Sequence, residues 1–454
     1  MRSLLLALAA LIAAPALSLT TAQTTAQTTT QTTAQTTAQT TGRTTAIVGG
    51  TLAIGDGSPP LPNGTVLFRN GRIVAAGSGV EIPAGATVID AHGKWVAAGI
   101  VAGFTDISIA EVMVAREGND TRAPKSPFSA GLDISSAVNP RSAVLGLERS
   151  GGVTRAIVSP EAAGSIFGGQ GAVIGLGPEP ITRPRAFEFV ELGEAGGLDA
   201  GGSRPAAFAM LRDALAQSEE YRRNPSAFGG REKDSLVKRS DAAALVAVLD
   251  GKLPLLAHVE RASDILAVLA LRNEYPKLQL VLLGATEGWM VAQQIAAAHV
   301  PVIAAALSDL PEDFERLGAT ESNVGLLDRA GVQVAISTIN QTEPQQQRRL
   351  TQLAGNLVGF GRLPGATGLE WGPAFATITS RPAHALGLDG EIGSLRPGRR
   401  ADVVIWDNDP LELSSAPVAV FIDGAPQSTR SRETELRDRY TTPTEGDLPK
   451  AYER

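Results

Sequence analysis

The stretch GKWVAAGIVAGFTDISI, residues 93–109, separates two kinds of sequence pattern. Short β-rich runs precede it, and alternating strand and helix patterns follow it. Within it, the apolar run 100–105 ends at Asp106, as a buried parallel strand does when it delivers a polar side chain to the carboxyl edge of a sheet. Active sites of α/β barrels lie at that edge. Asp106 is therefore a candidate site residue, with an ordinary core strand as the alternative.

Apolar runs and helical patterns alternate through the middle of the chain, from residue 98 to residue 388. Repeated alternation of this kind predicts a parallel sheet with helical crossovers, and at this length a (β/α)₈ TIM-like barrel. The expected strands lie at residues 100–105, 154–159, 172–176, 253–258, 278–283, 300–305 and 332–338, with one more near 187–190, and the expected helices at 141–150, 206–223, 240–249, 262–275 and 287–298.

Two β-rich flanks enclose this region. Residues 46–97 hold short strand patterns with an Asn70-Gly71 hairpin turn, and residues 389–425 hold two more strand patterns. Neither flank has enough strands for a core of its own, so we expect a small composite β-sandwich built from both chain ends. The polar tail 426–454 is predicted to be a solvated helix with a frayed end.

The N-terminus has the pattern of a targeting signal. Arg2 precedes an apolar run over residues 4–16, and small residues suited to cleavage follow, which predicts a signal peptide over 1–18 and cleavage between residues 16 and 22. The apolar run is shorter than the about 20 residues of a membrane span. Thr/Gln repeats over 19–45 are typical of a disordered spacer. We expect an exported protein, periplasmic or secreted.

The composition limits the partners and the catalytic groups that this protein can use. With 43% hydrophobic residues the 454-residue chain can bury a large core, and a net charge of −7 gives no basic surface for nucleic acid or anionic lipid. There is no cysteine, which excludes disulfides, thiolate metal ligands and a cysteine nucleophile. Catalysis would therefore depend on oxygen and imidazole groups.

Several stretches together resemble the amidohydrolase superfamily, most closely its imidazolonepropionase-like exported branch. The resemblance covers residues 46–424 and implies a metal-dependent hydrolase barrel with a β-sandwich made from both chain ends. It rests on the opening stretch GKWVAAGIVAGFTDI, on SRPAHALGLDGEIGSLRPGRRADVVIWDNDP at 380–410, and on GGVTRAIVSP at 151–160, GKLPLLAHVERASDI at 251–265 and LVLLGATEGW at 280–289.

The resemblance also implies positions for metal ligands, and most of them are substituted here. A His-x-His pair on the first strand falls on Phe104 and Asp106, and the histidine of the sixth strand falls on Gly284. Only the histidine of the fifth strand is kept, as His258. The aspartate of the eighth strand falls near residues 339–340. One histidine cannot assemble an imidazole-based zinc site, so either an atypical site holds one divalent metal, zinc or manganese, or no metal binds.

We expect the following site residues. Asp106, His258 and Asn340 are candidates for catalysis, and Asp106 and His258 with Glu260 or Glu287 for a carboxylate-rich metal site, with Glu287 preferred. Gln170, Thr286 and Thr338 are candidates for substrate binding, because they lie near the expected strand ends. Each also has a plainer interpretation: His258 hydrogen-bonded to a backbone carbonyl, Thr286 as a helix cap and the glycines beside Gln170 as a turn.

Two functions follow from these observations. The first is a hydrolase of C–N bonds in small or peptide-like amides, with an atypical metal site. The second is a catalytically inactive barrel that binds a small amide-like molecule or acts as the partner subunit of an active relative; a homo-oligomer is also compatible with the sequence. A serine- or threonine-based hydrolase is disfavoured because the chain has no GxSxG motif.

Overall fold

The computed structural model describes Gly42, residues 44–111, 116–226, Phe228, and residues 235–339 and 346–441. The predicted signal peptide, most of the Thr/Gln spacer, Asn340 and the end of the polar tail lie outside the described residues. Residues from Thr44 onward belong to one compact unit. Within the described part of the chain, we find no helix with the length and apolar character needed to span a membrane.

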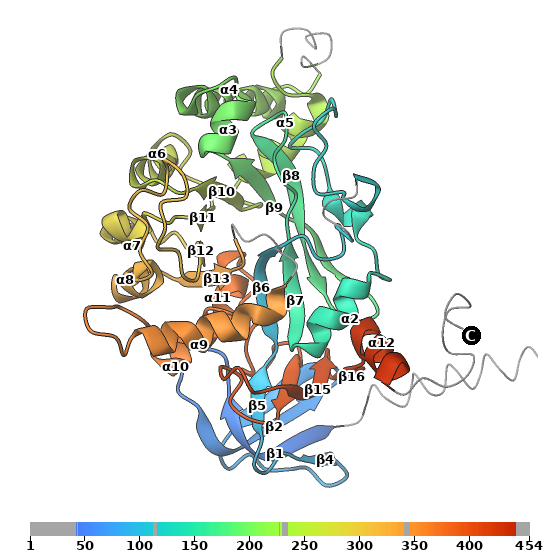
Figure 1. The fold of residues 1–454 in the computed structure, drawn as a ribbon. Helices are drawn as coiled ribbons and strands as arrows, with labels where there is room; N and C mark the ends of the chain where they lie inside the picture. The colour runs from blue at the N-terminus through green and yellow to red at the C-terminus, as the bar shows by residue number, and fades with distance from the viewer. Residues whose placement is uncertain are drawn as a thin grey trace, which may run out of the picture. The chain divides into compact units, whose positions relative to one another are not determined.

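The larger sheet forms a nearly closed eight-stranded barrel (Figure 1). This confirms the predicted TIM-like fold class. All eight expected strands are present, including the one expected near residues 187–190. In order around the sheet they are β6 (Ile100–Thr105), β7 (Val153–Val158), β8 (Phe167–Gly175), β9 (Ile181–Glu191), β10 (Leu255–Val259), β11 (Leu280–Gly284), β12 (Val302–Ala305) and β13 (Val334–Ser337).

The sheet departs from the predicted parallel arrangement at β8, which runs antiparallel to both β7 and β9. The other neighbouring strands that pair are parallel. The reason is the length of the connections: residues 159–166 precede β8 and residues 176–180 follow it, and neither segment contains a helix. Parallel strands need a crossover of a dozen or more residues, whereas short turns produce antiparallel pairs.

Helices lie outside the strands. In Figure 1, α6, α7 and α8 lie along the side of the sheet formed by β10, β11 and β12, the strands that they follow in sequence. The helix expected at 287–298 is divided into η3 and α7. The bounds are α2 (Ala143–Ser150), α3 (Glu194–Asp199), α4 (Arg204–Arg223), α5 (Arg239–Leu249), α6 (Ala262–Glu274), η3 (Gly288–Val291), α7 (Ala292–Ala297), α8 (Asn323–Arg329), α9 (Leu350–Phe360), α10 (Trp371–Ala376), α11 (Ser380–Ala385) and α12 (Arg432–Thr441).

Side chains join β6 to β13, the two strands at the ends of the sheet order. The Ser337 hydroxyl accepts from the Phe104 N–H at 3.1 Å and donates to the Phe104 carbonyl at 2.7 Å. Gln347 Nε2 donates to the same carbonyl at 3.2 Å and to Thr338 Oγ1 at 2.5 Å. The barrel is therefore closed at this seam by polar side chains.

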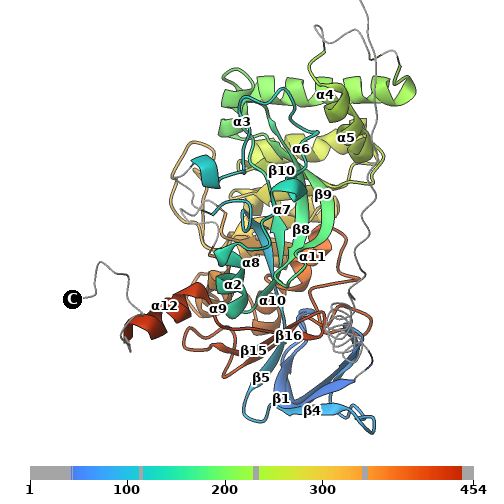
Figure 2. The ribbon, with the colours of Figure 1, turned by 90° about the vertical axis from the view of Figure 1, so that its right-hand side faces the viewer.

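A second sheet contains strands from both chain ends, as predicted. β5 pairs with β14 in antiparallel fashion, which places the blue amino-terminal strands beside the red carboxy-terminal ones (Figures 1 and 2). The Asn70-Gly71 hairpin is confirmed, and both residues have positive φ, 52° and 72°. The strand order is β16 (Ala425–Gln427), β15 (Pro417–Ile422), β14 (Val403–Trp406), β5 (Trp95–Ala98), β1 (Thr45–Ala53), β2 (Leu61–Arg69) and β3 (Arg72–Gly77), with β4 (Thr87–Asp90) beside β1.

A buried ion-pair cluster connects the barrel to this second sheet. Arg155 on β7 reaches Asp402 through Nε at 2.7 Å and Nη2 at 2.9 Å, and Asp423 through Nη2 at 2.8 Å. The Arg155 side chain is 2% exposed. The bidentate geometry fixes the orientation of the two sheets at this point.

The interior of the barrel is filled with apolar side chains. They form one continuous cluster that is closed at the amino ends of the strands by α11, so the barrel is a packed core. Its main members are Val101, Ile157, Val173, Phe187, Phe189, Leu256, Val281, Leu283, Ile303 and Ala335.

Candidate functional site

His258 lies at the carboxyl end of β10 and faces the barrel interior. Its orientation follows from strand alternation, because Leu256, two residues earlier, belongs to the interior cluster. Its Nδ1 atom lies 2.7 Å from Glu191 Oε2, and its Nε2 atom lies 3.2 Å from Glu260 Oε1. The imidazole is thus held between two carboxylates, and the interpretation of His258 as bonded to a backbone carbonyl is wrong.

The two carboxylates determine the charge of His258. Burial disfavours the imidazolium, but the charges and hydrogen bonds of Glu191 and Glu260 outweigh this effect and raise the pKa of His258 well above its ordinary value. The two carboxylates therefore favour the imidazolium form, in which both ring nitrogens donate. A metal ligand must instead offer the lone pair of a neutral imidazole. This arrangement thus favours a bound cation at His258 over a metal ligand.

Glu260 is fixed in place by Thr286, which follows β11. The Thr286 N–H donates to Glu260 Oε2 at 2.9 Å, and the Thr286 hydroxyl donates to the same oxygen at 2.7 Å. The Glu260 side chain is 1% exposed. It also fills the space beside Gly284, where a Cβ atom would lie 2.6 Å from the Glu260 carboxyl carbon. Gly284 has φ of 85°, which side chains rarely adopt.

The resemblance implies a second histidine at the position of Gly284. Glu260 occupies the space that the side chain of this histidine would take. The first-strand position is altered in another way. Phe104 packs against Phe189 of β9 with ring centroids 6.0 Å apart, and it joins the interior apolar cluster. An aromatic pair therefore stands where the resemblance implies an imidazole.

The other expected metal ligands are Asp106 and Glu287. Asp106 is buried directly after β6. Glu287 accepts from the Ala262 N–H at 3.0 Å through Oε2 and from the Gly318 N–H at 2.9 Å through Oε1, so it holds the start of α6 and a loop. In the ranges that the structure covers, no group of three His, Cys, Asp or Glu residues is placed to hold a metal. The described residues do not fit the implied metal centre.

The three expected substrate-binding residues serve separate contacts. Gln170 lies opposite Glu188 on β9, and its Nε2 atom donates to the Ala130 carbonyl at 3.3 Å. Thr286 holds Glu260, as described above, and Thr338 accepts from Gln347 at the barrel seam. The hydrogen bonds described for these three side chains therefore run to three different partners. Asn340 lies outside the described residues.

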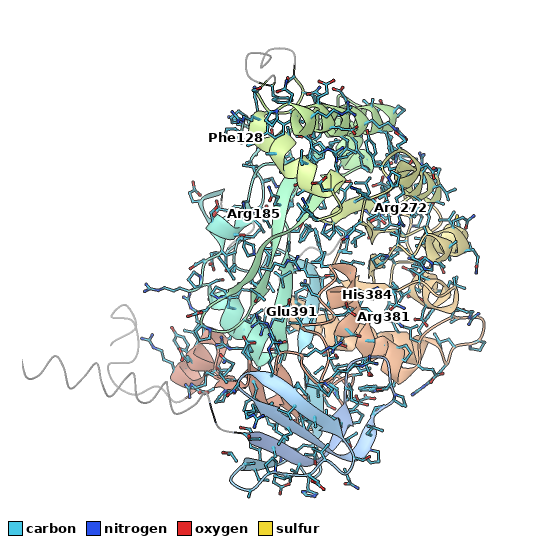
Figure 3. The ribbon with its side chains drawn as sticks, turned by 180° about the vertical axis from the view of Figure 1, so that it is seen from behind. Phe128, Arg185, Arg272, Arg381, His384 and Glu391 are labelled. Carbon is cyan, nitrogen blue, oxygen red and sulfur yellow. The ribbon has the colours of Figure 1, made fainter. Side chains whose placement is uncertain are left out.

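Histidines elsewhere do not contribute to the centre. His384 lies on α11, next to Arg381 in Figure 3, and α11 packs near the amino ends of β6 and β13. It is half-exposed, with Asp389 3.8 Å away. His92 is exposed in a turn, 2.5 Å from Asp90.

Sequence reasoning missed two acids near His258. Glu191 ends β9, a strand that the sequence placed only approximately, so its alternation with Phe187 and Phe189 could have indicated an inward-facing carboxylate. Glu315 lies in the segment after β12 and accepts from the Glu194 N–H at 2.7 Å. Burial raises the pKa of Glu315 above its ordinary value, although the Glu194 N–H, His258 and Arg204 oppose this shift. No local pattern identifies Glu315.

Known proteins resemble this chain in both sequence and fold. A model of the amidohydrolase family matches residues 322–426. The amidohydrolase tasK of Hapsidospora irregularis is 24% identical over 402 residues, 80% of this chain and 40% of tasK. The imidazolonepropionase of Maricaulis maris is 32% identical over 164 residues, 36% of this chain and 37% of that protein. The chain belongs to the amidohydrolase superfamily.

A solved structure has the same fold. The amidohydrolase from Thermotoga maritima MSB8 matches with a TM-score of 0.74 and 24% identity, covering 85% of this chain and all of that chain. The matched region spans about two fifths of the length of the curated relatives named above. The predicted membership of the amidohydrolase superfamily is confirmed. The chain differs from the implied metal-ligand pattern at the mouth of the barrel.

Proposed function

We propose that this amidohydrolase-superfamily barrel binds a small amide-like molecule and does not carry out metal-dependent hydrolysis. One observation carries the proposal: the carboxylates of Glu191 and Glu260 take both ring nitrogens of His258, and Glu260 also fills the space beside Gly284. A divalent ion would have to displace a proton from His258 and break the bonds between Glu260 and Thr286. Binding of a small molecule without hydrolysis requires neither the loss of that proton nor the breaking of those hydrogen bonds.

Hydrolysis of C–N bonds is the second candidate function. Membership of a superfamily of hydrolases supports it, and so does the set of ionisable residues at the carboxyl ends of the barrel strands. An atypical centre would use Asp106, His258 and Glu287 with one zinc or manganese ion. Glu287 would first have to release the Ala262 and Gly318 N–H groups, and its loss would weaken the start of α6.

Metal analysis separates the two candidates. The protein is purified without chelators or a histidine tag, incubated with equimolar zinc or manganese, desalted and analysed by elemental mass spectrometry. The binding proposal expects no stoichiometric metal. About one metal per chain, lost in His258→Ala and kept in the control His384→Ala, would overturn it in favour of the hydrolase. The control removes a half-exposed imidazole far along the chain from the centre.

We also propose that the chain is exported and that it pairs with a partner subunit. The pattern of Arg2 and the apolar run 4–16 supports export. The substituted ligand positions support pairing with an active relative, because a barrel without a complete metal site could serve as its partner subunit. Cell fractionation with intact-mass analysis tests export, which predicts a mature chain beginning between residues 17 and 23. Light scattering of the mature protein tests self-association.

A further inference from the structure

Helices α4 and α5 pack against each other, and a groove lies between the end of α4, the start of α5 and the loop that carries Phe128. Figure 1 shows the two helices side by side, and Figure 3 labels Phe128. The groove has a volume of about 720 Å³, within the range of about 300–1,000 Å³ that is typical of small-molecule sites. We call it the α4–α5 groove.

Hydrogen bonds hold the walls of the α4–α5 groove in place. Gln217 of α4 accepts from the Leu236 N–H at 3.0 Å through Oε1, which fixes the segment before α5 against α4. Asp241 of α5 accepts from the Gly131 N–H at 2.8 Å, which fixes the loop after Phe128 against α5. The groove is therefore formed before any ligand binds, and binding need not order its walls.

Aromatic side chains from three segments of the chain line the groove. The rings of Tyr221 and Phe228 meet edge to face, with centroids 5.4 Å apart and an interplanar angle of 80°. Phe128 is 47% exposed, and Val237 is a buried apolar residue of the wall. This wall offers apolar surface that a flat aromatic ligand can cover.

Two cations, Lys238 and Arg239, line the same groove at the start of α5. Neither side chain forms an ion pair in the part of the chain that the structure describes, and none of the described residues that line the groove is acidic. Asp241, the acid in the first turn of α5, does not line the groove, and its two oxygens accept backbone N–H groups from Gly131 and Lys238. The groove therefore combines aromatic rings with positive charge that no acid of its described walls balances.

We propose that the α4–α5 groove binds a small aromatic carboxylate, with its carboxylate at Lys238 and Arg239 and its ring against the aromatic wall. Ammonium and guanidinium groups only donate hydrogen bonds, and a carboxylate only accepts them, so the polar groups match. Charge-assisted hydrogen bonds of this kind are about twice as strong as neutral ones. The ring of the ligand removes the exposed ring of Phe128 from water, which adds a favourable apolar contribution.

This site is separate from the barrel mouth, because His258, Glu191 and Glu260 do not line the groove. The proposal goes beyond the function proposed for the mouth and does not depend on it. A failure to bind aromatic carboxylates would leave the choice between binding and hydrolysis at the mouth unchanged. A metal found at the mouth would likewise leave this proposal unchanged.

The test is isothermal titration calorimetry of the full chain with naphthoate, and with naphthylmethanol and naphthylmethylamine as its neutral and cationic counterparts. Naphthoate is expected to bind about tenfold or more tightly than the other two. Lys238→Met and Arg239→Met are each expected to weaken naphthoate binding about tenfold, by loss of a charge-assisted hydrogen bond, and to leave naphthylmethanol binding unchanged. Arg223→Met is the matched control. Arg223 is an exposed cation on α4 that pairs with Glu219 and does not line the groove, so its removal should change affinity less than about twofold.

Salt dependence and a groove-filling variant distinguish this site from general apolar adsorption. Naphthoate binding to the wild type is expected to weaken as the salt concentration rises from about 0.1 M to about 1 M, because the Debye length falls from about 10 Å to about 3 Å. Ala243→Trp places a large side chain in the groove and is expected to abolish naphthoate binding while circular dichroism shows a folded chain. No naphthoate binding to the folded wild type, equal affinity for naphthoate and naphthylmethanol, or naphthoate binding that Lys238→Met, Arg239→Met and Ala243→Trp leave intact would each overturn the proposal.

Discussion

Two buried clusters in this protein each place one cation between two acids, but they differ in the kind of cation. At the joint between the sheets, Arg155 contacts Asp402 and Asp423, and at the barrel mouth His258 contacts Glu191 and Glu260. A guanidinium keeps its charge at all ordinary pH values, whereas an imidazolium can lose its proton. The first cluster can therefore serve as a permanent joint, while the second holds together only as long as the proton stays.

The largest effect is expected from Arg155→Met, which leaves Asp402 buried beside Asp423 without a cation. Breaking a buried pair by removing one partner costs about 3–5 kcal/mol of unfolding free energy. Urea unfolding measures the loss. Arg185→Met is the control, because Arg185 is exposed and lies 3.7 Å from Asp133, so it is expected to change stability by less than about 1 kcal/mol. A loss below about 1 kcal/mol in Arg155→Met would show that the joint does not depend on this cation.

A third buried ion pair, Glu148 with Arg348, contains only one acid. Burial affects the pKa of this acid more strongly than the charge of Arg348 does. Burial raises the pKa of Glu148 to about 7, although Arg348 opposes the shift. Because the folded pKa lies above the unfolded value of 4.5, this group stabilises the fold fully below pH 4.5, and its contribution is lost as pH rises through about 7. The loss is at most about 3 kcal/mol.

Glu148→Gln removes this titration, so its unfolding free energy should depend less on pH between 4.5 and 7 than that of the wild type. Chemical unfolding at a series of pH values measures the difference. The control is Glu161→Gln, whose side chain is partly exposed. Parallel pH profiles for the wild type and Glu148→Gln would contradict the raised pKa.

His258→Gln tests the titratable cluster. The folded pKa of His258 is raised above the unfolded value of 6.5, so its contribution is fully present below pH 6.5 and is lost as pH rises through the folded pKa. The variant should be less stable by about 2 kcal/mol below pH 6.5, since two charged hydrogen bonds are weakened. The difference should decrease at alkaline pH, and His384→Gln should show no comparable trend. If the stability difference between the wild type and His258→Gln increased with pH, the assignment of a positive charge to His258 would be wrong.

The sequence located the strands well but not the partners of their side chains. Apolar runs predicted all eight barrel strands, and Asn70-Gly71 predicted its hairpin, because these signals are local. The antiparallel direction of β8 depends on the short connections beside it and not on the apolar run that predicted the strand. Glu191 and His258 are 67 residues apart, and only the parallel register of β9 and β10 brings them together.

The surroundings of Gly284 could likewise not be predicted from the sequence. Its identity showed that a ligand was missing, but the sequence could not show that Glu260 had taken the vacant space. That fact depends on the backbone conformation of Gly284 and on the hydrogen bonds from Thr286. The expected metal set of Asp106, His258 and Glu287 likewise assumed that carboxylates near strand ends would converge, whereas Glu287 holds the start of α6.

The smallest effect is expected from a pair of alanine substitutions that separates backbone strain from the contact with Glu260. Gly284 has φ of 85° and Gly331 has φ of 91°, so Gly→Ala introduces a similar strain of about 1–3 kcal/mol at both. A Cβ atom at Gly331 meets open space, whereas one at Gly284 meets the Glu260 carboxylate. Gly284→Ala should therefore lose about 1 kcal/mol more than Gly331→Ala in urea unfolding. Equal losses would mean that Glu260 moves aside readily, which would leave room for a ligand beside His258 and favour the hydrolase over the binding barrel.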